Sequence, residues 1–197
     1  MKQDKTQLKN VTVDILERTL DKCLIWFYAH PLHKIGLSDL ARAINSSKTA
    51  TKQVVELLAS PQRGFLHKEI VGNAWLLYAN QKHAYFLTKK VPYHLSKIYE
   101  SGILEAVRKA VPSARAIILF GSYRWGTDVE ESDIDIAVEV VADQDVKIAT
   151  LGTIGELGYR KNVKVNMFIF SRNKIDLNLF SNIANGIVLD GFLEVRP

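Results

Sequence analysis

The feature that most constrains this chain is a Gly-Ser pair followed, after ten residues, by two aspartates separated by one residue. An apolar run over 117–120 leads into Gly121 and Ser122, and Asp133 and Asp135 open a second apolar run. Side chains of a strand alternate between its two faces, so the aspartates point the same way while the residue between them points into a core. The pattern predicts a strand, a tight turn, a short helix and a second strand.

Two neighbouring carboxylates repel one another unless a cation lies between them. Mg²⁺ prefers oxygen ligands of this kind and binds substrate phosphates at the same time, so Asp133 and Asp135 are the candidate metal ligands. Gly121 lets a polyphosphate approach the backbone, and Ser122 offers a hydroxyl and amides at a helix start. This combination favours nucleotidyl or phosphoryl transfer over the alternative, a plain turn beside two solvated acids.

These residues resemble the minimal nucleotidyltransferases of the DNA polymerase β superfamily, and the resemblance covers roughly residues 100 to 193. It implies that Gly121 and Ser122 hold a nucleoside triphosphate while the two aspartates hold Mg²⁺. The implied reaction is a two-metal, in-line attack on the α-phosphate, with pyrophosphate leaving. Arg124 is a candidate clamp for the phosphates, and a solvated surface charge is the alternative for it.

The sequence departs from this family where a third acid is expected on the next strand, because Asn166 stands there. We place Asn166 with Asp133 and Asp135 in the candidate catalytic set. An amide orients a water or ligates a metal weakly, but it does not accept a proton near neutral pH. General-base assistance typically contributes about a hundred- to ten-thousand-fold. We therefore expect slow chemistry, or an acid borrowed from a substrate protein.

The first half of the chain is basic. Residues 1–100 hold 15 Lys and Arg against 8 Asp and Glu, whereas residues 101–197 hold 11 against 13. Such asymmetry is typical of a segment that binds a polyanion, and a solvated basic surface is the plain alternative.

Three helices and a hairpin are predicted in this half. The helices are expected over 11–30, over 39–44 with Ser38 as N-cap, and from the turn at 45–47 to about 59 with a buried stripe of Ala50, Val54, Leu57 and Leu58. Strands are expected over 66–71 and 74–78, around Gly72-Asn73.

This order resembles a winged helix-turn-helix. The third helix would then enter the major groove of double-stranded DNA while the hairpin lies against the backbone or the minor groove. The expected DNA contacts are polar residues of the helix and the hairpin: Ser47, Lys48, Thr51, Lys52, Lys68 and Asn73. A winged helix used only for protein contacts or for a homodimer is the alternative.

The expected organisation is a winged helix domain over 1–80, a connecting segment and helix over 81–111, and a nucleotidyltransferase domain over 112–197. The connecting helix is predicted over 93–111, with Pro92 in its first turn. The last domain is predicted to contain a helix over 142–157, a strand over 164–170, a helix over 177–184 and a strand over 187–189. The fold class is α/β, or α+β, with a small mixed sheet.

The single cysteine, Cys23, allows no disulfide within the chain and is expected to be a small buried residue, which fits a reducing cytoplasm. Residues 1–5 are polar and lack an apolar signal region. The apolar run over 23–29 is too short to span a membrane, so no membrane association is expected.

Three classes of function follow. The first is an enzyme that moves NMP from an NTP to a hydroxyl of a protein or small molecule. Members of the resembled family that are paired with HEPN-type toxins adenylylate their partner, so a HEPN-type toxin is a candidate acceptor and antitoxin a candidate role. The second is a DNA-binding transcriptional regulator whose transferase fold senses a nucleotide, which Asn166 favours. The third is an interaction module without nucleotide, which the intact Gly-Ser turn and aspartates disfavour.

Overall fold

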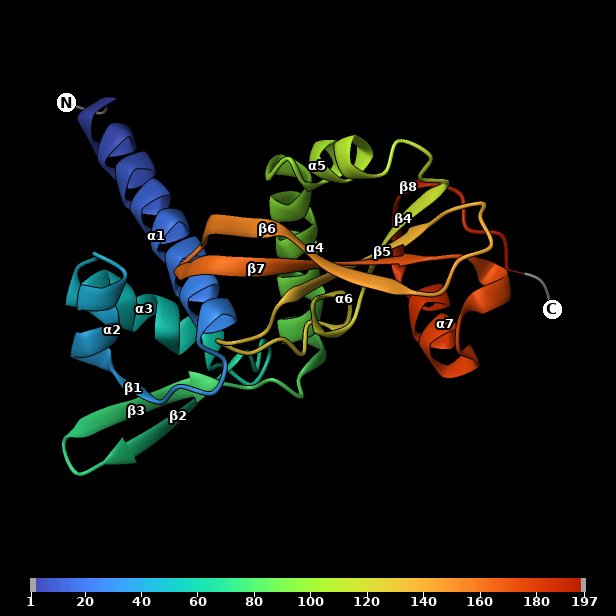
Figure 1. Ribbon diagram of the computed structural model, residues 1–197. Coiled ribbons are helices and arrows are strands. Elements are labelled where there is room, and N and C mark those ends of the chain that lie inside the picture. The colour runs from blue at the N-terminus through green and yellow to red at the C-terminus, as the bar shows by residue number, and fades with distance from the viewer. Residues whose placement is uncertain (1–2, 196–197) are drawn as a thin grey trace. The chain divides into compact units, whose positions relative to one another are not determined.

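The computed structural model describes residues 3–195, and the chain divides into two compact units between Phe86 and Leu87 (Figure 1). The first unit runs through a helix, a short strand, two helices and a hairpin. Its elements are α1 (Gln3–Ala29), β1 (Ile35–Gly36), α2 (Leu37–Ala43), α3 (Lys48–Leu58), β2 (Leu66–Val71) and β3 (Ala74–Ala79). The strands form an antiparallel sheet in the order β1-β3-β2. This is the order of elements that the winged helix prediction requires, and that assignment stays a prediction.

The hairpin is confirmed, because Val71 pairs with Ala74 across the two turn residues. Ser47 is the N-cap of α3, and its Oγ accepts a hydrogen bond from the Ala50 amide at 3.1 Å. That interaction satisfies one of the amides that the first turn of a helix leaves without a partner.

Three details of the elements of this unit differ from the prediction. Helix α1 begins at Gln3, before the predicted start at residue 11. Helix α2 begins at Leu37 with Gly36 as N-cap and no side-chain cap, so Ser38 is not its N-cap. The reason is that β1 pairs with β3 up to Gly36 and the chain passes directly from strand to helix. Leu57 does not belong to the buried stripe of α3, since 42% of its surface is exposed and Val55 is buried instead.

The second unit is built on a mixed sheet. Helix α4 (Ala84–Glu100) crosses the unit boundary, and the elements that follow are α5 (Ile103–Ala110), β4 (Ala116–Phe120), α6 (Ser122–Trp125), β5 (Ile134–Glu139), β6 (Lys147–Leu157), β7 (Arg160–Phe170), the short 3₁₀ helix η1 (Arg172–Lys174), α7 (Leu177–Ala184) and β8 (Ile187–Gly191). The strand order is β6-β7-β5-β4-β8. Strands β5 and β7 are parallel, while the other neighbouring pairs are antiparallel.

Helices cover both faces of the sheet at β4, which explains why this strand is apolar throughout. Ile117 and Leu119 pack with residues of α5, whereas Ile118 packs with Ile183 of α7. Figure 1 shows α5 and α7 on opposite sides of the sheet. A strand that is buried on both faces is a continuous apolar run rather than an alternating one.

The helix predicted over 142–157 is wrong, because β6 lies there and pairs with β7 in a long hairpin. Gly152 and Gly155 weaken a helix at this place. Ile148 and Ile154 are β-branched residues that favour a strand.

The connecting helix also differs. Helix α4 starts well before Pro92, which lies inside it rather than in its first turn. Gly102 has φ 78°, a left-handed conformation that separates α4 from α5. The expected single helix over 93–111 is therefore two helices.

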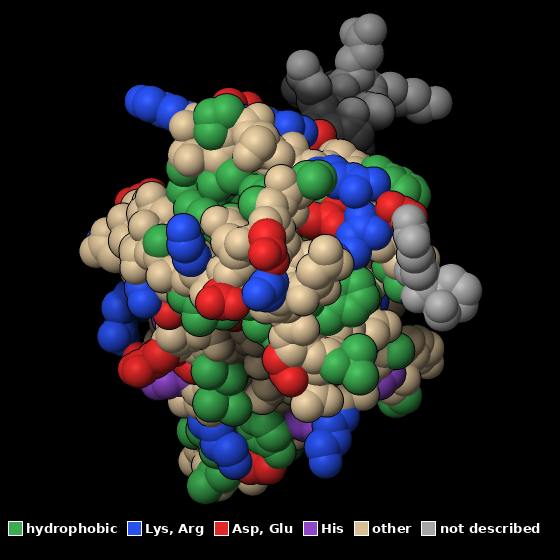
Figure 2. Space-filling model, turned by 45° about the vertical axis from the view of Figure 1, so that its right-hand side comes forward, with side chains coloured by type: hydrophobic (Ala, Val, Ile, Leu, Met, Phe, Trp, Pro, Cys, Tyr) green, Lys and Arg blue, Asp and Glu red, His purple; other side chains and the backbone are tan. Residues whose placement is uncertain are grey.

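Cys23 has no exposed surface, and burial raises the pKa of its thiol to about 12, as expected for an inert core residue. Within residues 3–195, no helix has both the length and the apolar character needed to cross a membrane. The face seen in Figure 2 carries basic and acidic side chains interspersed with one another.

Candidate active site

The turn between β4 and α6 requires glycine. Gly121 has φ 72° and ψ −154°, a region that is essentially restricted to glycine. A Cβ atom at this position would lie 2.9 Å from Oδ2 of Asp135, closer than real Cβ contacts allow. The bare backbone of the turn therefore lies directly against one carboxylate of the pair, and Ser122 follows it as the first residue of α6.

The alternation predicted for the acidic strand is confirmed. Ile134 and Ile136 have no exposed surface, whereas Asp133 and Asp135 are both partly exposed. Burial raises the pKa of Asp135, the Asn166 hydrogen bond lowers it in part, and the neighbouring Asp133 raises it further. Such a carboxylate pair gains stability when a cation binds to it.

Strand β7 brings Asn166 beside the aspartates. The parallel register places Asp135 opposite Asn166. The Asn166 amide nitrogen donates hydrogen bonds to Asp133 Oδ2 at 3.2 Å and to Asp135 Oδ1 at 3.1 Å. The structure thus brings together all three residues of the predicted catalytic set.

Lys164 is a fourth member of this cluster that the sequence pattern did not identify. Its Nζ lies 3.6 Å from Asp133 Oδ2. Lys164 precedes Asn166 by two residues on the same strand, so the alternation of side chains that aligns the two aspartates also aligns these two residues.

The residues present fit one divalent cation. In the described part of the chain, no group of three or more His, Cys, Asp or Glu side chains could hold a metal ion. Asp133 and Asp135 would be the protein ligands, and phosphate oxygens and waters would complete the shell, as Mg²⁺ usually requires.

Arg124 lies at the far end of α6, where its side chain is already engaged. Its Nε donates to the Asn185 carbonyl at 2.6 Å, and its guanidinium lies 3.7 Å from the centre of the Trp125 ring. Trp125 is 51% exposed. A contact between Arg124 and phosphate stays a prediction.

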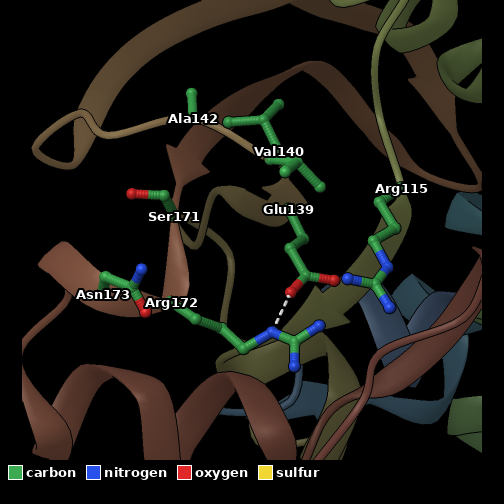
Figure 3. Close-up of a pocket in the computed structure, with 8 residues that line it drawn as sticks. Arg115, Glu139, Val140, Ala142, Ser171, Arg172 and Asn173 are labelled. Atoms are coloured by element: carbon green, nitrogen blue, oxygen red, sulfur yellow. Dashed lines mark hydrogen bonds and ion pairs between the residues drawn. The ribbon is translucent and has the colours of Figure 1, made fainter.

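A pocket of about 310 Å³ lies at the opposite end of β5 from the aspartates, around Glu139. Figure 3 shows Arg115 and Arg172 directed toward the Glu139 carboxylate. Glu139 is 2% exposed and accepts a bond of 2.5 Å from Arg172, while both arginines also pair with Glu194. Because the charges of this pocket are paired with each other and it lies away from the aspartates, we assign it no part in nucleotide binding.

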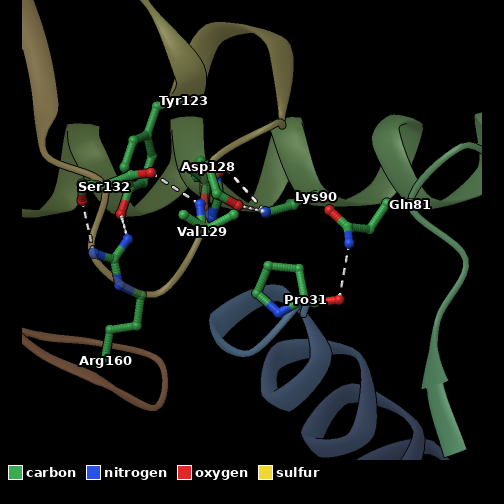
Figure 4. Close-up of polar contacts among 9 residues, drawn as sticks. Pro31, Gln81, Lys90, Tyr123, Asp128, Val129, Ser132 and Arg160 are labelled. Carbon is green, nitrogen blue, oxygen red and sulfur yellow. Dashed lines mark hydrogen bonds and ion pairs between the residues drawn. The ribbon is translucent and has the colours of Figure 1, made fainter. Parts of the chain in front are cut away.

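A buried polar network holds the loop between the two halves of the motif (Figure 4). Lys90 of α4 donates to the Asp128 carbonyl at 2.7 Å, and its Nζ lies 3.0 Å from Asp128 Oδ1. Arg160 donates to the Ser132 carbonyl at 2.6 Å and to the Tyr123 hydroxyl. The segment that carries Asp133 is therefore fixed to α4 and to β7.

Burial dominates the electrostatics of this network. It lowers the pKa of Lys90 and raises the pKa of Asp128, and the attraction between the two charges opposes both shifts. It also lowers the pKa of His94 to about 3, with further lowering by Lys90 and Arg160. The sequence pattern did not mark Lys90, because it precedes the helix predicted from Pro92 onward.

The expected DNA contacts of the first unit are exposed with one exception. Thr51 has no exposed surface and donates to the Ser47 carbonyl at 2.9 Å, so its proposed contact with DNA is wrong. It belongs to the buried face of α3. Ser47, Lys48, Lys52, Lys68 and Asn73 are exposed.

Trp75 of β3 is a residue of this surface that the sequence pattern did not single out. The Lys68 and Lys52 ammonium groups lie 4.4 Å and 5.5 Å from the centre of its ring. A pocket of about 420 Å³ beside Trp75 is lined in part by Lys48, Lys52 and Asn73. Helix and hairpin thus present their basic groups around one aromatic side chain.

Comparison with known proteins agrees with the geometry of the second unit. No curated protein matches the chain at a significant level. Residues 100–187 match the model of a family described as the nucleotidyltransferase domain. The matched segment contains the Gly121 turn, both aspartates and Asn166, and it supports a minimal nucleotidyltransferase whose general chemistry is nucleotidyl transfer.

Proposed function

We propose that the second unit binds Mg²⁺ and an NTP at Asp133 and Asp135 and transfers NMP to a hydroxyl of a protein or a small molecule. The observation that carries this proposal is the close approach of the Gly121 turn to the Asp135 carboxylate, which leaves no room for a Cβ atom between them. It supports the proposal because backbone that a phosphate could approach lies next to a proposed metal ligand, as phosphoryl-transfer sites require.

Each residue has a separate part in this proposal. Gly121 leaves the turn open to the triphosphate, and Ser122 offers its hydroxyl and amide. The aspartates hold the metal, which neutralises the charge of the phosphates when it is bound. Asn166 orients the aspartates through its two hydrogen bonds but accepts no proton. The acceptor hydroxyl must therefore lose its proton to water or to a carboxylate of the acceptor molecule. A HEPN-type toxin is the candidate acceptor that the family resemblance offers.

Calorimetric titration of the full chain with ATP, with and without Mg²⁺, tests the binding site. We expect Mg²⁺-dependent binding that Asp133→Ala and Asp135→Ala each reduce by at least about tenfold, since each removes a charged ligand. Asp145→Ala is the matched control, because Asp145 is an exposed aspartate of another loop. Absence of Mg²⁺-dependent binding in the natural sequence would refute the proposal.

A second function is favoured by Asn166, which occupies the place of a proton acceptor without being one. In this alternative the second unit senses a nucleotide, and the first unit binds duplex DNA as a transcriptional regulator. ATP labelled on its α-phosphate separates the two functions. Label on a protein or small-molecule acceptor supports the transferase, whereas clear binding without label on any acceptor supports the sensor.

A further inference from the structure

We propose that the candidate active site holds a single divalent cation, because Lys164 and Asn166 occupy the place where a second cation would need ligands. This inference rests on the proposed binding of Mg²⁺ and NTP. It replaces the two-metal arrangement that the sequence resemblance implies.

The side chains that face the aspartates from β7 lack the chemistry of a second metal site. Strands β5 and β7 are neighbours, and the register that pairs Asp135 with Asn166 places Lys164 on the same side of the sheet. A two-metal site needs anionic oxygens that coordinate both ions, which lie about 3.5–4 Å apart. Strand β7 instead contributes an ammonium and an amide, and an ammonium has no lone pair with which to ligate a metal.

One oxygen of each aspartate is already engaged by a side chain of β7. Asn166 donates to Asp133 Oδ2 and Asp135 Oδ1, and the Lys164 ammonium approaches the same Asp133 oxygen. Rotating the amide by half a turn would offer a carbonyl oxygen, but that ligand is neutral. In either orientation the β7 side of the pair lacks the negative charge that would hold a second divalent ion.

The place left for a single cation is on the side of the pair that faces the Gly121 turn. The other oxygen of Asp135, Oδ2, faces the Gly121 turn, where a Cβ would approach it to 2.9 Å. The triphosphate is proposed to bind at this turn. The single cation therefore lies between the aspartates and the nucleotide. The ion that the site does not hold is the one on the β7 side, which would activate the attacking hydroxyl.

This inference is tested by measuring Mn²⁺ binding to the full chain with electron paramagnetic resonance. The sample contains an ATP analogue that cannot be cleaved at its α-phosphate. Two Mn²⁺ ions at the spacing of a two-metal site couple magnetically and broaden the spectrum, whereas one isolated ion does not. We expect one uncoupled Mn²⁺ per bound analogue in the natural sequence. We expect two coupled ions in the Lys164→Ala/Asn166→Asp variant.

Lys161→Ala is the matched control, since Lys161 is an exposed lysine of the same strand, and it should keep one ion. Lys164→Gln is a milder second variant that removes the ammonium without adding an acid, and it should bind Mn²⁺ several-fold more tightly. Circular dichroism confirms that each variant is folded.

The outcomes separate this inference from the proposed function. No Mn²⁺ bound with the analogue would refute the proposed function itself. Two coupled ions in the natural sequence would overturn the single-cation inference while leaving nucleotide binding intact. One ion in both the natural sequence and a folded double variant would show that Lys164 and Asn166 do not exclude the second ion, and would also overturn the inference.

Discussion

Gly121 is the residue at which backbone conformation and site chemistry coincide. Its φ and ψ lie in a region that costs other residues about 1–3 kcal/mol. An added methyl group would also meet Asp135 Oδ2 at 2.9 Å and displace a proposed metal ligand. The glycine is therefore required twice, once for the turn and once for the carboxylate beside it.

We predict that Gly121→Ala lowers the free energy of unfolding by about 1–3 kcal/mol and weakens Mg²⁺–ATP binding at least about tenfold. Urea denaturation and calorimetry measure the two effects. Gly155→Ala is the control, because Gly155 has no positive φ and no atom within 4 Å of an added Cβ, and it should change stability by less than about 0.5 kcal/mol. Unchanged nucleotide binding in Gly121→Ala would contradict the close approach of phosphate to this turn.

His94 predicts a dependence of stability on pH. It is 3% exposed and packs against the Tyr123 ring at 4.7 Å between centroids, and the charged groups around it are Asp128, Lys90 and Arg160. Burial holds its pKa near 3, against 6.5 for a free histidine. At a pH between these two pKa values, the unfolded chain binds a proton at His94 that the folded chain does not bind. The contribution of His94 to stability is therefore fully present above pH 6.5 and is lost as the pH falls toward 3.

The loss from this residue is at most about 1.4 kcal/mol for each pH unit below 6.5. We predict that His94→Gln flattens the curve of unfolding free energy against pH over this interval, whatever its effect at neutral pH. His67→Gln, at an exposed histidine, serves as the control for the removal of one imidazole. Parallel curves for the natural sequence and His94→Gln would show that the folded chain binds the His94 proton as readily as the unfolded chain does.

At the scale of elements, the ion pair between Lys90 and Asp128 connects α4 to the loop that separates the two halves of the site. Both side chains are buried, at 0% and 1% exposure, so neither charge is compensated by water. Removal of one partner of such a pair leaves an unpaired buried charge and typically costs about 3–5 kcal/mol.

We predict that Lys90→Met and Asp128→Leu each destabilise the chain by about 3–5 kcal/mol, and that the double variant is much less destabilised than the sum of the two. Urea denaturation of the four proteins gives the coupling energy. Additive losses would mean that the two charges do not stabilise each other. Lys97→Met is a suitable control on the same helix, because its pair with Glu100 is half-exposed and is worth at most about 1 kcal/mol.

The sequence predicts an element well when local interactions stabilise it, and poorly when pairing with a distant strand does. Helix α7 has the predicted bounds, since its N-cap Asp176 and its apolar spacing are local. Strand β6 was predicted as a helix because its conformation is set by pairing with β7, which no local pattern reveals. The aspartates were found from alternation within a strand, and Asn166 from the place where the resembled family carries a third acid. Lys90 and Asp128, in contrast, meet only in the folded chain, 38 positions apart.

At the scale of the whole molecule, the charge follows the division into two units. Residues 1–86 hold 12 Lys and Arg against 7 Asp and Glu, whereas residues 87–197 hold 14 of each. The net charge of +5 thus belongs to the first unit. A polyanion is therefore expected to bind the first unit, whereas the second unit is proposed to bind its nucleotide through a metal rather than through excess positive charge.

We predict that the first unit binds duplex DNA through the exposed lysines of α3 and that this binding is separable from nucleotide binding. Lys48→Ala/Lys52→Ala should reduce the slope of log affinity against log salt by about 1.8, since each phosphate contact contributes about 0.9. Its Mg²⁺–ATP affinity should stay that of the natural sequence, because both substitutions lie outside the second unit. Fluorescence anisotropy over a range of salt concentrations measures the slope.

Lys82→Ala/Lys89→Ala removes the same charge from two exposed lysines outside α3 and is the matched control. An equal loss of affinity in both double variants would indicate attraction to net charge rather than contacts made by α3. Affinity that is indifferent to salt would exclude phosphate contacts altogether. Loss of DNA affinity in Lys48→Ala/Lys52→Ala alone, with nucleotide binding intact, would mean that one chain carries two separate binding functions. The first unit would then bind phosphate by ion pairing, and the second unit would bind it with the help of a metal.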